Sequence, residues 1–220
     1  CGVAGPSGCD NACGSTATVD CSGECGGSAV DDSFGICGGD GTLQGAIDAA
    51  NSGDTINVSA GVYNESMLID KSLNIQGAGS DVTFVTGGVV ISGEFNGLTI
   101  EGLSLSGDGP GPKNSVIDSR NTTGPVSDIT LRNCVLDGEN DGKYAFYGHY
   151  ITGTWTFDGC EIKNFSSWYV IDNTGSSHSV PYKLSNVVFT NNTVHHVGGT
   201  IAFRGKFDEP MDSAVISGNT

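Results

Sequence analysis

The stretch Ile100-Glu101-Gly102 is one of six related triplets, each an apolar residue, a polar residue and then Gly or Asn. The triplets recur at intervals of 25 to 32 residues. The other five are Ile75-Gln76-Gly77, Leu131-Arg132-Asn133, Phe157-Asp158-Gly159, Leu184-Ser185-Asn186 and Ile216-Ser217-Gly218. Gly and Asn adopt the left-handed backbone region at low cost, so the triplets predict one bend with positive φ that recurs along the chain. A bend repeated at this interval is typical of a solenoid.

Residues on both sides of these bends alternate between apolar and polar, as in Leu98, Leu103 and Leu105 around Gly102. This period of two predicts strands rather than helices. A second apolar series lies between the bends and includes Val90-Ile91-Ser92. Two strand series with one common period predict an all-β fold, a parallel β-helix whose coils pair about 4.8 Å apart. No coil can bury its apolar face alone, so neighbouring coils must stabilise one another.

The composition is strongly acidic, with 25 Asp and Glu against 9 Lys and Arg and a formal charge of −16. This balance argues against nucleic acid and anionic membranes as partners, because both need a basic surface. It could attract cations such as calcium, although no metal ligands can be assigned. No apolar run is long enough for a membrane span. The chain begins at Cys1 without Met, and we expect a processed product or a fragment.

Six of the eight cysteines fall within the first 37 residues. They are Cys1, Cys9, Cys13, Cys21, Cys25 and Cys37. This density predicts a disulfide framework among these residues and an oxidising, extracellular location, while the pairing stays open. A zinc module is the alternative, but the segment has neither a Cys-x-x-Cys pair nor a nearby His.

We divide the chain into a Cys/Gly-rich, disulfide-stapled segment at residues 1–41 and a β-helix at residues 42–220. The first segment has too little apolar content for a core. A short helix at 42–52 opens the second, with Thr42 as N-cap and Gly53 as terminator. We expect this amphipathic helix to cap the end of the solenoid.

Two resemblances extend these predictions. The run Asp20-Cys21-Ser22-Gly23-Glu24-Cys25-Gly26-Gly27 resembles Cys/Gly-rich repeats of large secreted surface proteins, whose pattern has a further Cys near Phe34 that is absent here. The stretches Gly53-Asp54-Thr55-Ile56, Gly61-Val62-Tyr63-Asn64-Glu65 and Lys71-Ser72-Leu73-Asn74-Ile75-Gln76-Gly77 resemble the opening coils of the pectin lyase-like superfamily. The first resemblance implies extracellular display. The second implies a right-handed parallel β-helix but no particular activity.

Cys134 and Cys160 follow the bend at the same station of successive coils. Their Cα atoms should lie about one rung apart, within the range of a disulfide, and we expect the bond to form. A pair of stacked, reduced thiols is the alternative.

Five Asn-x-Ser/Thr sequons offer sites for N-glycans if the source is eukaryotic. Asn121, Asn164 and Asn191 lie next to predicted loops and are preferred over Asn57 and Asn64.

The catalytic signatures of pectin methylesterases, polygalacturonases and pectate lyases are absent or incomplete, so no catalytic residues and no cofactor are assigned. One alternative constellation consists of Asp118, His149, Asp172 and Arg204, which follow the second strand series and should line one outer column. Asp118 and Asp172 would lie about 9–10 Å apart, near the upper separation in inverting glycosidases. A row of solvated turn residues explains the same pattern.

The last coil begins at residue 214 and has no capping segment after its bend. We expect that the protein continues beyond Thr220 or that the open end stacks on a neighbour, because an uncovered strand edge is a template for pairing. Head-to-tail contacts that do not close make filaments. The sequence therefore predicts a secreted structural or adhesive protein that self-associates and could contact glycans. The alternative function is a lyase or inverting hydrolase that acts on acidic polysaccharides.

Overall fold

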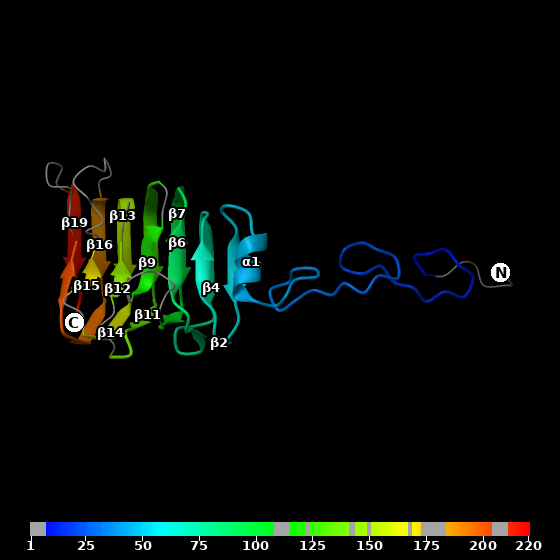
Figure 1. Cartoon of the computed structure of the whole chain (residues 1–220), viewed down its shortest axis with the longest axis horizontal. Coiled ribbons are helices and arrows are strands. Elements are labelled where there is room, and N and C mark those ends of the chain that lie inside the picture. Colours follow the sequence, from blue (N-terminus) through cyan, green and yellow to red (C-terminus); the bar gives the residue numbers. More distant parts are fainter. Residues whose placement is uncertain are drawn as a thin grey trace. The chain divides into compact units, whose positions relative to one another are not determined.

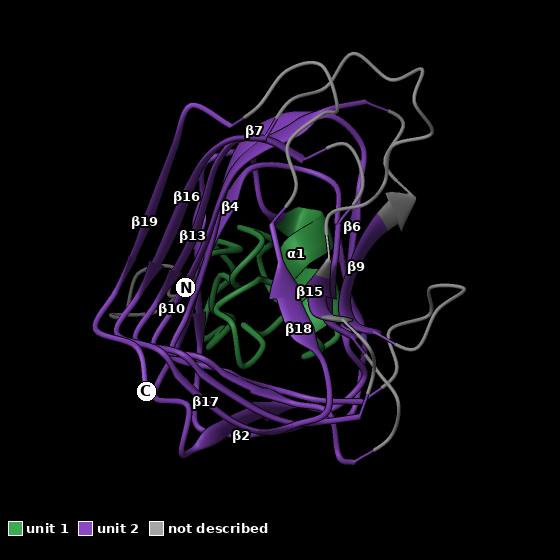
Figure 2. Ribbon diagram, turned by 90° about the vertical axis from the view of Figure 1, so that its left-hand side faces the viewer, with its two compact units in different colours: residues 1–49 green, residues 50–220 purple. Residues whose placement is uncertain are grey.

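The computed structural model describes residues 8–107, 115–121, 124–140, 144–148, 151–166, 169–172, 184–203 and 211–220, apart from the side chains of residues 120, 121, 169 and 172. The chain divides into two compact units, Cys1–Ala49 and Ala50–Thr220 (Figure 2). The predicted helix is α1 (Leu43–Ala49), which belongs to the first unit. Thr42 is its N-cap, because the Thr42 Oγ1 accepts a hydrogen bond from the Gly45 N–H at 2.9 Å. The predicted boundary at residue 41 and the capping role of the helix stay predictions.

Three parallel sheets form the second unit (Figure 1). The first contains β1 (Thr55–Val58), β4 (Leu73–Gly77), β7 (Phe95–Glu101), β10 (Val126–Arg132), β13 (Ile151–Asp158), β16 (Leu184–Thr190) and β19 (Ser213–Ser217). The second contains β2 (Gly61–Tyr63), β5 (Thr83–Val85), β8 (Ser104–Leu105), β11 (Val135–Asp137), β14 (Glu161–Phe165) and β17 (Thr193–Val197). The third contains β3 (Met67–Ile69), β6 (Val89–Ser92), β9 (Ser115–Asn121), β12 (Tyr144–Tyr147), β15 (Tyr169–Asp172) and β18 (Thr200–Ala202).

Each strand pairs with the strands three places before and after it in the chain, and the coils stack one on the next (Figures 1 and 2). This arrangement confirms the predicted parallel β-helix. Alternation along the strands turns one set of apolar side chains inward, where residues in register form ladders. The longest ladder runs through Ile56, Ile75, Ile100, Leu131, Phe157, Phe189 and Ile216. Its first six members are at most 6 % exposed.

The stacked bend is also confirmed at four of the predicted positions. Gly102, Asn133, Gly159 and Gly218 have φ between 51° and 68°. Gly77 occupies the same station without a left-handed φ; a Cβ there would lie 2.2 Å from the Gly102 carbonyl oxygen, so close backbone approach requires the glycine.

The prediction of a bend at Asn186 is wrong. Asn186 lies inside β16, where it pairs with Thr154 and Ser213. The bend comes later, at Asn191, with φ of 56°. Phe189-Thr190-Asn191 has the same apolar-polar-Asn pattern, and the pairing of Phe189 with Phe157 selects it over the earlier triplet.

The first unit confirms a disulfide framework, with bonds Cys9–Cys25 and Cys21–Cys37, each spanning 16 residues. Cys13 is also disulfide-bonded, and Cys1 lies outside the described residues. Ser33 occupies the position that Cys21 has in the preceding repeat. With the same spacing of 16 residues, a cysteine at position 33 would pair with position 49, which is the last residue of α1. The described disulfides end before this helix, at Cys37.

An Asp-centred turn occurs twice in this unit. The Asp20 carboxylate accepts hydrogen bonds from the N–H groups of Glu24 at 2.9 Å and Ala29 at 3.1 Å. Asp32 repeats the pattern with Ile36 at 2.9 Å and Gly41 at 3.1 Å. Since the unit has almost no apolar core, these carboxylates and the disulfides fix its conformation.

Candidate functional site

An inward-facing column of polar side chains follows the bends. It consists of Cys134, Cys160, Asn192 and Asn219, with Cys134, Cys160 and Asn192 buried. Asn192 Nδ2 donates to the Phe157 carbonyl oxygen of the previous coil at 3.0 Å, and its Oδ1 accepts from the Cys160 N–H at 2.9 Å. Asn219 Nδ2 makes the corresponding bond to the Phe189 carbonyl oxygen at 2.9 Å. The Asn192 amide therefore accepts the Cys160 N–H that follows the bend, and both amides add a hydrogen bond to a strand carbonyl of the preceding coil.

The two thiols replace amides in the same column. Cys134 Sγ donates to the Ile100 carbonyl oxygen at 3.4 Å, and Cys160 Sγ donates to that of Leu131 at 3.5 Å. The expected disulfide between Cys134 and Cys160 is not present, because both are free. A disulfide would remove both S–H donors and with them these two hydrogen bonds. Hydrogen bonding to the Cys160 thiol, together with burial, holds the pKa of Cys134 well above its ordinary value, so this thiol stays protonated and unreactive at neutral pH.

The alternative catalytic column on the third sheet is only partly formed. Asp118 pairs in register with Tyr147, and Tyr147 with Asp172, so the two acids hold positions two rungs apart as predicted. However, Asp118 is only 1 % exposed and lies 3.3 Å from the Ser115 hydroxyl, which donates to it. The prediction that it lines a solvated outer column is therefore wrong. His149, Arg204 and the Asp172 side chain lie outside the described residues.

Polar side chains run along the outer face of the first sheet. Arg132 lies between Glu101 and Asp158, with nitrogen–oxygen distances of 3.9 Å to each. Asp158 also accepts hydrogen bonds from the Thr190 hydroxyl at 2.8 Å and the Asn191 amide at 2.9 Å. These two hydrogen bonds and the Arg132 charge hold the pKa of Asp158 below its ordinary value. On the later coils, therefore, the polar groups of this face are already paired with one another.

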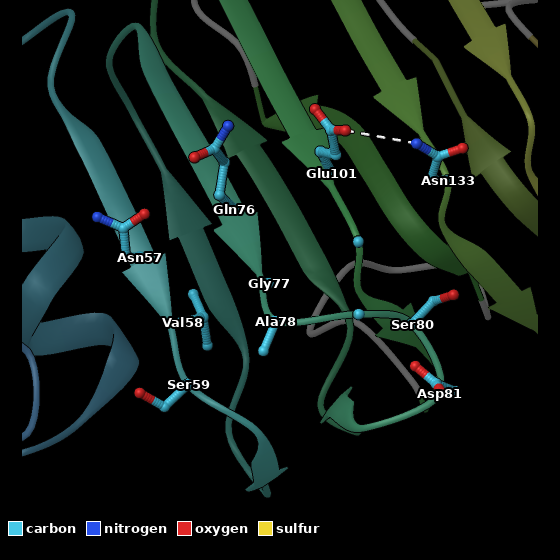
Figure 3. Close-up of a pocket in the computed structure, with 12 residues that line it drawn as sticks. Asn57, Val58, Ser59, Gln76, Gly77, Ala78, Ser80, Asp81, Glu101 and Asn133 are labelled. Carbon is cyan, nitrogen blue, oxygen red and sulfur yellow. Dashed lines mark hydrogen bonds between the residues drawn. The ribbon is translucent and has the colours of Figure 1, made fainter.

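The first coils differ, because they form a groove of about 740 Å³ (Figure 3). Asn57, Gln76 and Glu101 stand side by side in register at its floor. Its other lining residues are Val58, Ser59, Gly77, Ala78, Gly79, Ser80, Asp81, Gly102 and Asn133. Glu101 is partnered, since its Oε1 accepts from Asn133 Nδ2 at 3.4 Å.

The groove exists because one bend is longer than the rest. Five residues, 78–82, separate β4 from β5, whereas two residues separate the strands at each of the other five described bends between the first and second sheets. The extra segment is held by hydrogen bonds from the N–H groups of Val82 and Thr83 to the Gly79 carbonyl oxygen, at 3.1 and 2.9 Å. Sequence reasoning missed this site. The wide spacing between Gly77 and Thr83 was the only signal.

A cluster of charged groups lies on the second sheet. His195 Nε2 is 2.8 Å from Glu161 Oε1, and Lys163 Nζ is 3.1 Å from Glu161 Oε2. The hydrogen bond with His195, followed by that with Lys163, holds the pKa of Glu161 below its ordinary value. His195 and His196 place their Nδ1 atoms 2.8 Å apart. These groups satisfy one another and line no described groove.

The described sequons differ in how free their amides are. Asn164 Nδ2 donates to Asp137 at 2.9 Å, and Asn191 Nδ2 donates to Asp158. Asn64 accepts from the Thr86 hydroxyl at 2.9 Å, and Asn57 is exposed in the groove. The Asn121 side chain lies outside the description. Occupancy by glycans stays a prediction; among the described sequons, the Nδ2 atoms of Asn164 and Asn191 are engaged in hydrogen bonds, whereas Asn57 and Asn64 are exposed.

Cys21, Asp31 and Cys37 place potential metal-ligating atoms within 4.8 Å of one another. The two cysteines are bonded to each other, so neither offers a thiolate, and this group does not fit a metal ion.

The chain matches no protein-family model, no curated protein and no solved structure. Its disulfides indicate an oxidising compartment, which fits an extracellular location. The described part of the chain has no helix long and apolar enough to cross a membrane.

Proposed function

We propose that this chain is a secreted structural or adhesive surface protein, a building unit of an extracellular filament or surface layer that joins end to end through its β-helix. The supporting observation is the exposure of Ile216 on β19. This side chain is in register with Phe189, which is 5 % exposed, but is itself 64 % exposed. It is the outermost member of the longest apolar ladder.

Each sheet presents a strand edge at this end of the described solenoid. β17 and β18 belong to the last complete coil, and β19 lies one rung beyond it, on β16. An incoming chain can therefore add strands to the edges of all three sheets. Burying the Ile216 side chain would contribute about 1–2 kcal/mol, and the three edges would add backbone hydrogen bonds. Because the contact is heterologous and would stack each unit on the next along the solenoid axis, repetition would not close and would give a filament.

The test compares two substitutions on one strand. Ile216→Lys places a charge in the inward column, whereas Val215→Lys places it on the outward face, where Val215 is already 49 % exposed. We expect the unaltered chain and the Val215→Lys variant to form polymers as concentration rises at neutral pH, and the Ile216→Lys variant to stay monomeric. Analytical ultracentrifugation and electron microscopy measure this. A monomeric unaltered chain at high concentration would refute the proposal.

The second candidate is a polysaccharide-active enzyme of the pectin lyase-like superfamily. The register that places Asp118 and Asp172 two rungs apart favours it. The burial of Asp118 argues against it, because an inverting mechanism needs a water molecule between the two carboxyl groups. Cleavage of a polyuronate that is abolished by Asp172→Asn would support this candidate, and no cleavage by the unaltered chain would exclude it for that substrate.

A further inference from the structure

We propose that the groove at the enlarged bend binds a neutral, hydroxyl-rich ligand, namely a short oligosaccharide. This site lies on the outer corner between the first and second sheets, and it stands independently of the end-to-end assembly. It involves neither β19 nor the acids of the third sheet.

The first support is a break in an otherwise regular repeat. The bend at 78–82 is longer than the other described bends of this corner, and the groove lies against it. In solenoids, insertions confined to one repeat map to loops on one face, which is often the binding face. The groove volume of about 740 Å³ falls within the range of small-molecule sites, which is about 300–1,000 Å³.

The second support is the state of the lining side chains. Within the described part of the chain, Asn57, Gln76, Ser80 and Asp81 line the groove without an intramolecular side-chain hydrogen bond or ion pair. The polar side chains on the same outer face at Arg132 and Asp158, by contrast, are paired with their neighbours. The groove thus presents free donors and acceptors in one place, as Figure 3 shows for Asn57 and Gln76.

The chemistry of these groups selects the ligand. Carboxamides both donate and accept, hydroxyls do the same, and carboxylates accept, so together they match vicinal hydroxyl groups. Asp81 and Glu101 give the groove negative charge, which disfavours a uronate or phosphate. The described residues that line the groove include no aromatic ring, so we expect weak binding, with a Kd of about 1 mM.

Saturation-transfer difference NMR tests this with cellotriose and maltotriose as neutral probes and trigalacturonate as the anionic probe. The method suits weak ligands and tolerates a large assembly. We expect saturation transfer to at least one neutral trisaccharide and none to trigalacturonate. Gln76→Ala should weaken the neutral ligand about threefold to tenfold, because it removes one or two hydrogen bonds. Asn74→Ala is the matched control, since Asn74 is also exposed on β4 but outside the groove, and it should leave binding unchanged.

Three results would overturn the proposal. They are no transfer to either neutral probe, equal binding by the Gln76→Ala and Asn74→Ala variants, and stronger binding of trigalacturonate than of the neutral sugars. None of these bears on polymer formation, which Ile216→Lys tests separately.

Discussion

Replacing Cys160 by Asn should stabilise the protein. Cys160 lies on the rung before Asn192 in the inward column, and its S–H makes a weak hydrogen bond of 3.5 Å to the Leu131 carbonyl oxygen. An amide at this position could donate an N–H to the same carbonyl and accept the Cys134 N–H, which faces the Cys160 sulfur. Asn192 makes this pair of bonds one rung further on.

The magnitude follows from the hydrogen bonds exchanged. An ordinary intramolecular hydrogen bond contributes about 0.5–1.5 kcal/mol net. The two amide hydrogen bonds should be stronger than the thiol bonds that they replace. After the cost of ordering the amide side chain and repacking its neighbours, we expect the free energy of unfolding to rise by about 1 kcal/mol. For a unit of this size that corresponds to a rise in Tm of about 2–4 °C. Cys160→Ala is the paired variant: it removes the S–H hydrogen bond to the Leu131 carbonyl oxygen and opens a small cavity, at a cost of about 1–2 kcal/mol.

Thermal unfolding followed by circular dichroism measures both variants under non-reducing conditions. Thiol titration of the unfolded, non-reduced protein checks the premise, and we expect two free thiols, those of Cys134 and Cys160. If Cys160→Asn lowered Tm as much as Cys160→Ala does, the thiols would not be acting in place of column amides. Loss of both free thiols to a disulfide would refute the reasoning as well.

Two predictions concern the first unit. Gly27→Ala should impair oxidative refolding, because a Cβ would lie 2.1 Å from Asp20 Oδ2, while Ser28→Ala should not; the yield of correctly paired disulfides measures both. Acid should loosen the turns at Asp20 and Asp32. Hydrogen bonds, led by the Ser22 hydroxyl for Asp20 and the Ile36 N–H for Asp32, hold the pKa of each carboxyl below its ordinary value. Their contribution is therefore complete above the unfolded pKa of about 3.9 and is lost as pH falls through the folded value. The protection factors of the Glu24 and Ile36 amides, which are relative to the intrinsic exchange rate at each pH, should fall below about pH 4, and unchanged protection there would contradict this.

The regular part of the fold could be predicted from the sequence because each rung obeys the same local rule. Alternation with period two fixes which side chains face inward, and Gly or Asn marks each bend. The error at Asn186 shows the limit of a pattern. Leu184-Ser185-Asn186 and Phe189-Thr190-Asn191 satisfy the same rule, and only pairing with β13 decides between them. Register is a property of neighbouring coils, so a single repeat does not contain it.

The thiol pair and the groove escaped prediction for opposite physical reasons. Cys134 and Cys160 were placed correctly, but the inference of a bond considered only the distance between them. The structure instead shows each thiol donating to a carbonyl oxygen of the preceding coil, that of Ile100 for Cys134 and that of Leu131 for Cys160. The groove depends on the bend at 78–82, which departs from the two-residue length of the other described bends between the first and second sheets. Periodicity therefore predicts the β-helix itself. The candidate functional features lie where a coil departs from the repeat, and predicting them requires knowledge of the contacts between coils.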